Sequence, residues 1–113
     1  MVTNISERSE TMFINIVEFP PIKASKDDEF KEWFAWSNSV FEKFDGFISR
    51  RLLKPTKGKG NYAAIVEHES EETFMAMHMS KEREKVHETV KALFDGSPKP
   101  SFYAVIVSSE KKK

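Results

Sequence analysis

The order of strand-like and helix-like segments constrains the fold of this chain more than any other feature of its sequence. Four segments are rich in β-branched and aromatic residues and end near turn residues, which is typical of strands: 12–19, 47–54, 61–68 and 101–107. Helical periodicity separates the first strand from the second and the third from the fourth. The order βαββαβ predicts a ferredoxin-like α+β domain, in which two crossover helices cover one face of a four-stranded antiparallel sheet.

Both helical regions carry recognisable start and stop signals. Ser25 can cap the first helix, predicted over 25–44, because three acidic residues follow it in the first turn. The turn residues 45–46 end that helix. Its apolar stripe has helical spacing and consists of Phe30, Phe34, Phe41 and Phe44, widened by Trp33 and Val40. The second helical region begins at Ser70 and is expected to break near Ser80.

The first and last strands are apolar on both faces, although the helices can cover only one face of the sheet. The other face therefore needs a cover, and a second copy of the same sheet would supply one. The sequence thus predicts a homodimer built as a dimeric α+β barrel.

Composition narrows the cellular setting and the partners. The chain has 18 basic and 18 acidic residues and no cysteine, which favours neither nucleic acid nor disulfides. No apolar run approaches the roughly 20 residues of a membrane helix, so we expect a cytoplasmic protein that does not bind membranes. We predict a flexible N-terminal tail over 1–11, one domain over 12–108 and a basic C-terminal tail over 109–113.

Two polar residues stand out against apolar surroundings. Asn15 lies inside a predicted strand, where a buried amide needs a hydrogen-bond partner in the protein or in a ligand. His87 lies at the edge of the apolar stripe of the second long helix, where its imidazole can face a cleft. His68 and His78 lie at element ends and receive no role. The sequence contains no phosphate-binding glycine loop, no His-rich metal spacing and no recognisable nucleophile–base pattern.

Several segments resemble the IsdG-type heme-degrading monooxygenases, especially their mycobacterial branch. They are 14–20 (INIVEFP), 46–47 (GF), 52–58 (LLKPTKG) and 69–74 (ESEETF). The resemblance covers about 12–107 and lies within the wider antibiotic biosynthesis monooxygenase superfamily. It implies the dimeric α+β barrel and an enzyme whose heme is both substrate and cofactor, cleaved with oxygen and an electron donor. No flavin and no independent metal site are expected.

The resemblance assigns roles to four residues. The family's strand-one Asn, which hydrogen-bonds on the distal side of the iron, corresponds to Asn15, and its proximal axial His corresponds to His87. A pocket-lining Phe on the first helix corresponds to Phe34. The family's Trp, which presses on the porphyrin, corresponds to Met77, a softer and narrower side chain.

Two other functions remain open at this point. One is a cofactor-free monooxygenase of the same fold that acts on a quinone or a polyketide-like aromatic, with Asn15 and His87 polarising a phenol. The other is a binding or stress-response module without turnover, which the replacement of the family's Trp by Met77 keeps open.

Overall fold

The computed structural model describes residues 11–109. Nearly all of the predicted N-terminal tail and most of the predicted basic C-terminal tail lie outside this range. In the described part, no helix is of the length and apolar character that crossing a bilayer demands.

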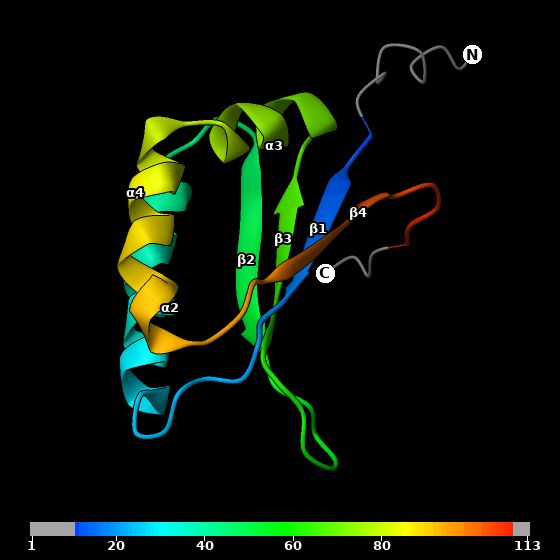
Figure 1. The fold of residues 1–113 in the computed structure, drawn as a ribbon. Helices are drawn as coiled ribbons and strands as arrows, with labels where there is room; N and C mark the ends of the chain where they lie inside the picture. The colour runs from blue at the N-terminus through cyan, green and yellow to red at the C-terminus, as the bar shows by residue number, and fades with distance from the viewer. Residues whose placement is uncertain (1–10, 110–113) are drawn as a thin grey trace, which may run out of the picture.

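Four strands form one antiparallel sheet. They are β1 (Phe13–Glu18), β2 (Phe47–Leu53), β3 (Ala63–His68) and β4 (Lys99–Ala104), and their order across the sheet is β2-β3-β1-β4. Helices α2 and α4 lie on the same side of the sheet and α3 lies at its end, as Figure 1 shows. The predicted ferredoxin-like α+β fold is therefore confirmed.

The second helical region is divided into two α-helices and a final 3₁₀ turn. They are α3 (Glu71–His78), α4 (Lys81–Val90) and η1 (Lys91–Leu93). Ser70 and Ser80 cap the two α-helices, because each hydroxyl accepts a hydrogen bond from the backbone N–H three residues later. The predicted break near Ser80 is confirmed.

The first helix, α2 (Asp27–Phe41), is shorter than the predicted 25–44. Ser25 does not cap it. Its backbone lies in the left-handed region with φ of 66°, and Lys26 occupies the N-cap position without a side-chain cap bond. The helix is nevertheless fixed by its phenylalanines, since Phe30 is fully buried against the sheet.

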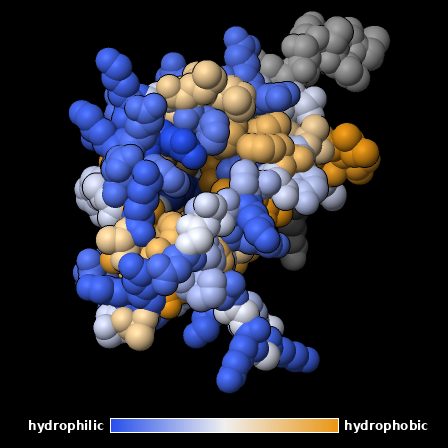
Figure 2. All heavy atoms as spheres, viewed as in Figure 1, coloured by the Kyte–Doolittle hydropathy of each residue, from blue (hydrophilic) through white to orange (hydrophobic). Residues whose placement is uncertain are grey.

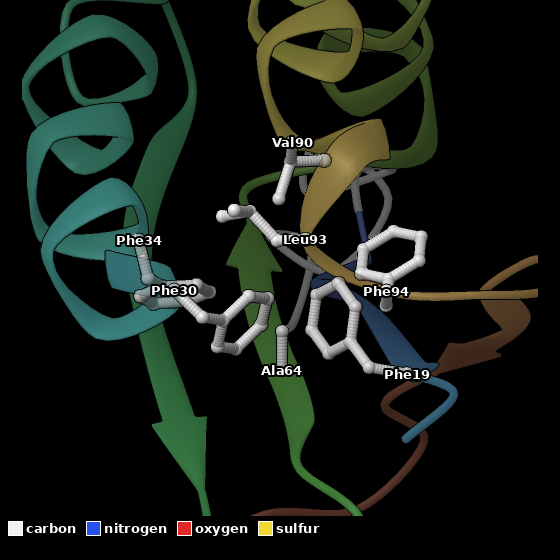
Figure 3. Packing of buried hydrophobic residues seen from close by; sticks show 7 residues of the cluster. All are labelled: Phe19, Phe30, Phe34, Ala64, Val90, Leu93 and Phe94. Atoms are coloured by element: carbon white, nitrogen blue, oxygen red, sulfur yellow. The ribbon is translucent and has the colours of Figure 1, made fainter. Parts of the chain in front are cut away.

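Two apolar clusters hold the helices on the sheet. Figure 3 shows the first, in which side chains of α2, the end of α4 and η1 meet those of β3 and the end of β1. Its buried members are Phe19, Phe30, Phe34, Ala64, Val90, Leu93 and Phe94. The second cluster lies nearer α3 and contains Phe13, Phe41, Val66, Phe74, Met77 and Val86. Burial of this apolar surface contributes about 25 cal/mol per Å².

The opposite face of the sheet carries apolar side chains that no described element covers. In the strand register, Ile14 opposes Tyr103 and Ile16 opposes Ile65, all on this open face. Ile14, Ile16 and Ile65 are half-buried, whereas Tyr103 and Leu53 are exposed.

The last strand begins and ends earlier than predicted, at 99–104 rather than 101–107. The reason is its partner. β4 pairs only with β1, and its pairing ends opposite Phe13, where β1 begins. Beyond one further backbone bond at Val105, the chain leaves the sheet, and Ile106 and Val107 are more than four-fifths exposed. In Figure 2, apolar atoms stand out at the right of the molecule, where Figure 1 shows the chain continuing beyond β4.

A close contact between Gly46 and Thr73, in the first turn of α3, holds the start of this helix against the sheet. Gly46 has φ of 84°, and its carbonyl accepts a hydrogen bond from Glu69 N–H at 2.8 Å. A Cβ at this position would lie 2.3 Å from Thr73 Oγ1. Thr73 Oγ1 in turn lies 2.9 Å from Nδ1 of the fully buried His68. Glycine is therefore required both for its backbone angle and for space.

We expect Gly46→Ala to lower the free energy of unfolding by about 3 kcal/mol, because left-handed backbone and overpacking each cost about 1–3 kcal/mol. Chemical denaturation measures this loss. Gly58→Ala is the matched control, since Gly58 has φ of 70° with open space around it. A similar loss in both variants would show that the contact with Thr73 is unimportant.

His68 makes stability depend on pH. Burial lowers its pKa below the ordinary 6.5, and its enclosed Nε2 has no hydrogen-bond partner among residues 11–109. As pH falls below 6.5, the unfolded chain binds a proton that the folded chain does not bind. The free energy of unfolding should therefore decrease between pH 7 and pH 5.

His68→Phe should flatten that decrease, because the ring would still pack between Phe47 and Phe74 but could no longer be protonated. Denaturation curves at a series of pH values measure the slope. His78→Phe, at a half-buried position, is the comparison and should flatten it less. Equal slopes in the wild type and His68→Phe would contradict this account.

Candidate functional site

A cavity of about 290 Å³ lies between the sheet and the helices that cover it. Figure 2 shows the molecule hollowed beside α4, with apolar atoms recessed among hydrophilic ones. The sheet, α2, α3, α4 and the segment before β4 all contribute to its wall. The lining residues are mostly apolar, and the polar ones are Asn15, Arg50, His78, Arg83, His87 and Ser97.

The charge on the wall has one sign. Two arginines, Arg50 and Arg83, line the cavity, and the lining residues include no aspartate or glutamate. With apolar surroundings of low dielectric, such a cavity attracts anions more strongly than a solvated surface would. The excess of positive charge is local to the cavity wall, because the chain as a whole has no net charge.

Asn15 reaches the cavity from the centre of the sheet. It is buried, and its Nδ2 donates a hydrogen bond to the carbonyl oxygen of Ser101 on β4 at 3.1 Å. The amide therefore has the structural partner that a buried strand asparagine needs, supplied by a neighbouring strand. Since Asn15 also lines the cavity, that bond fixes the orientation of a polar group that a ligand can contact.

His87 reaches the same cavity from α4. Burial lowers the pKa of its half-buried imidazole, and the nearby cations Arg83 and Lys91 lower it further, against a smaller opposing effect of Glu88. The ring is therefore neutral at pH 7. A neutral imidazole has a free nitrogen lone pair, which is what metal coordination or proton abstraction requires.

Met77 and Phe34 differ in position. Met77 lines the cavity, and it is buried among the residues of the second apolar cluster. Phe34 does not line the cavity, contrary to the sequence prediction. It faces the core, and the guanidinium of Arg50 lies over its ring with Cζ 3.9 Å from the ring centroid. Arg50, not Phe34, forms the wall at this point.

Arg50 is the most unusual residue of the site, and its place there was not predicted from the sequence. Its Nη1 donates to Ser37 Oγ and Asn38 Oδ1, each at 2.7 Å, from β2 across to α2. Burial lowers its pKa to about 9, so the guanidinium remains charged at neutral pH. One signal was available: Arg50 lies two residues before Leu52, and alternation places both on the helix-covered face.

Trp33 was expected only as part of an apolar stripe, yet it also lines the cavity. Its Nε1 donates to Thr89 Oγ1 at 3.0 Å and to the Val86 carbonyl at 3.3 Å. These bonds connect α2 to α4 and hold the segment that carries His87. Trp33 therefore positions the helical side of the site.

The other histidines occupy different places. His78 lines the cavity from the end of α3, stacked on Phe74 with ring centroids 5.5 Å apart. Burial, and then the charge of Arg83, lowers its pKa. His68 is not a lining residue. The cavity thus has two imidazoles on its helical side and one amide on the sheet.

Comparison with known proteins identifies the family. Residues 12–89 match the model of the family described as antibiotic biosynthesis monooxygenase, which is more than half of the chain. The chain belongs to this family. Membership supports an oxygenase role for the protein.

A heme oxygenase (mycobilin-producing) of Mycobacterium tuberculosis is 35% identical over 63 residues, which are 56% of this chain and 57% of the relative. The chain thus spans little more than half the length of that curated relative.

Two solved structures share the fold at lower identity. The heme-degrading protein Rv3592 of M. tuberculosis has a TM-score of 0.69 at 20% identity, over 90% of this chain and 99% of the other. SnoaB, a cofactor-independent oxygenase from Streptomyces nogalater, has a TM-score of 0.69 at 17% identity, over 90% and 98%. The fold alone therefore does not separate heme degradation from cofactor-free oxygenation.

Proposed function

We propose that this protein is a heme-degrading monooxygenase that binds heme through His87. The observation that carries the proposal is the position of the His87 imidazole on the wall of an apolar, cationic cavity that Asn15 also lines, where burial lowers the pKa of the ring. The 35% identity to a mycobacterial heme oxygenase supports the choice of heme over other aromatic ligands.

The residues present fit this ligand. His87 would hold the iron through an imidazole nitrogen, and the apolar residues of the sheet and α3 would pack against the flat porphyrin. The positive charge of the wall favours an anionic ligand over a neutral one. When bound, heme supplies both the redox-active iron and the carbon that is oxidised.

Asn15 orients the group that reacts. Its bond to Ser101 holds the amide plane, so that the amide presents a fixed polar edge to a ligand in the cavity. A donor that is already oriented costs no reorganisation during the reaction. The apolar wall around it excludes water.

Met77 alters the shape of the pocket relative to the heme-degrading relatives that the sequence resembles. A thioether side chain is flexible and narrow, so it packs against a flat ring without pressing on it as an indole would. Heme binding then persists while turnover becomes slower or its product changes. We propose that an electron donor, not identified from the sequence, supplies the electrons for the reaction.

A hemin titration tests the axial role of His87. The wild-type protein should shift and sharpen the Soret band, and His87→Ala should lose that spectrum. His78→Ala is the matched control, because His78 lines the same cavity and should leave the axial spectrum unchanged. With ascorbate under air, the wild-type Soret band should then decay with release of iron.

Two results would contradict the proposal. An unchanged spectrum in His87→Ala would remove this residue as the ligand, and loss in His78→Ala alone would assign the other imidazole. If hemin does not bind at all, the second candidate gains support.

That second candidate is cofactor-free oxygenation of an aromatic substrate, which the fold shared with SnoaB favours. In this reading, a neutral His87 takes the proton of a phenol, and the cationic wall stabilises the resulting anion. Oxygen uptake with a phenolic substrate and no hemin binding would support it. Hemin binding without decay would instead support a binding module.

We also propose that the protein is a homodimer that buries the open face of the sheet against a second copy. The half-buried isoleucines Ile14, Ile16 and Ile65 form the centre of that face, with Tyr103 exposed beside them. A copy of the same apolar surface is a self-complementary cover.

Ile16→Glu and Tyr103→Glu should each lower the solution mass from that of two chains to that of one, because a carboxylate would be buried in the interface. Light scattering after size-exclusion chromatography measures the mass. Ala35→Glu on the exposed side of α2 is the control and should remain dimeric. A monomeric wild-type protein would refute the assembly.

A further inference from the structure

Arg50 has no anionic partner within residues 11–109, unlike the lysines that form ion pairs on the surface. The ion pairs within residues 11–109 join surface groups, such as Lys23 with Asp95 and Lys91 with Glu88, and none includes Arg50. A guanidinium placed among aromatic rings and away from carboxylates carries an uncompensated charge. Its retention in the core needs a reason.

Neutral groups hold the guanidinium but do not balance it. Nη1 donates to Ser37 Oγ, to Asn38 Oδ1 and, at 3.5 Å, to the Phe34 carbonyl. The rings of Phe34 and Phe41 lie below, with centroids 3.9 Å and 4.6 Å from Cζ. These contacts fix the plane of the group, and they use one of its three nitrogens.

The other two nitrogens of Arg50 remain available. Within the described residues, neither Nε nor Nη2 donates a hydrogen bond. Among the side-chain nitrogens of residues 11–109 that lack a hydrogen-bond partner, the fully enclosed one is His68 Nε2. Nε and Nη2 of Arg50 are therefore not fully enclosed. Arg50 is itself one of the residues that line the cavity. Nε and Nη2 form one edge of the guanidinium, whose two parallel N–H bonds match the two oxygens of a carboxylate.

The cavity does not provide that carboxylate itself. Within residues 11–109 no acidic residue lines it, and Arg83, His78 and His87 add further positive or neutral groups. A ligand that carries a carboxylate would supply the missing negative charge.

We propose that Arg50 is a specificity-determining residue that binds a carboxylate of the ligand through Nε and Nη2, so that the site selects flat, apolar molecules that carry a carboxylate. Ser37 and Asn38 are positioning residues that hold the guanidinium in the required plane. On the proposed function, on which this choice of ligand rests, the carboxylate is one of the two propionates of heme. The subsite itself requires only an aromatic carboxylate.

Paired ligands test the proposal directly. Hemin and hemin dimethyl ester share the ring and the iron, but the ester lacks both carboxylates. The wild-type protein should bind hemin at least about tenfold more tightly than the ester, which corresponds to one charge-assisted contact. In Arg50→Gln the ratio should fall close to one, mainly through weaker binding of hemin.

Two further variants separate the carboxylate contact from general effects. Arg50→Lys should restore only part of the ratio, because an ammonium is a point charge without the paired N–H edge. Arg83→Gln is the matched control, since it removes a cation from the same wall and should keep most of the preference. An unchanged ratio in Arg50→Gln would overturn the proposal, and so would an equal loss in Arg83→Gln.

Folding is monitored independently. Arg50→Met should melt at the wild-type temperature or above, because an apolar side chain of similar length removes an unbalanced charge. A large fall in melting temperature would assign Arg50 a structural role and count against the proposal. Equal ester affinity in the wild type and Arg50→Gln would show that the cavity itself is intact.

A second pair of ligands distinguishes a failure of this proposal from a failure of the proposed function. If neither hemin nor its ester binds, 2-naphthoate and 2-naphthol are compared instead. Binding of 2-naphthoate that Arg50→Gln abolishes would retain the carboxylate subsite and reject heme as the ligand. Equal binding of both naphthalenes, or binding of neither, would reject the subsite as well.

Discussion

The two-residue period of β1 is the constraint on which the rest of the structure depends. This strand is central in the sheet, with β3 on one side and β4 on the other. Its odd-numbered residues face the helices and its even-numbered residues face the opposite way. The same six residues therefore place an amide in the cavity and an apolar row on the open face. A shift of one residue in the register would exchange the two surfaces.

The sequence predicts the features that follow from periodicity. Apolar alternation and turn residues give the four strands, and the serines at 70 and 80 give the caps of α3 and α4. Asn15 could be selected because it is polar between apolar strand neighbours, and His87 because it lies at the edge of an apolar helical stripe. The limits of α2 and β4 could not be predicted as well, since the end of β4 is set by where β1 begins and not by the composition of β4 itself.

Arg50 and Phe34 show why the remainder of the site was only partly predictable from the sequence. Alternation from Leu52 places Arg50 on the helix-covered face, but the pairing of β2 with β3 is irregular between Phe47 and Ser49, so alternation from Phe47 gives the opposite face. Alternation also does not indicate that aromatic rings enclose Arg50, whereas Arg51 is exposed. Phe34 had the correct helical spacing, but whether it or the arginine above it forms the wall depends on tertiary packing.

The bond between Asn15 and Ser101 connects the interior of the site to the least protected strand. β4 is an edge strand that is exposed along its whole length and pairs with a single neighbour. Edge segments with few buried contacts open locally at a much lower free energy than the whole molecule unfolds. Each such opening would release the amide of Asn15 from its partner. The fraction of time that the amide is correctly oriented is thus set by the local opening equilibrium of β4, even though Asn15 itself belongs to the centre of the sheet.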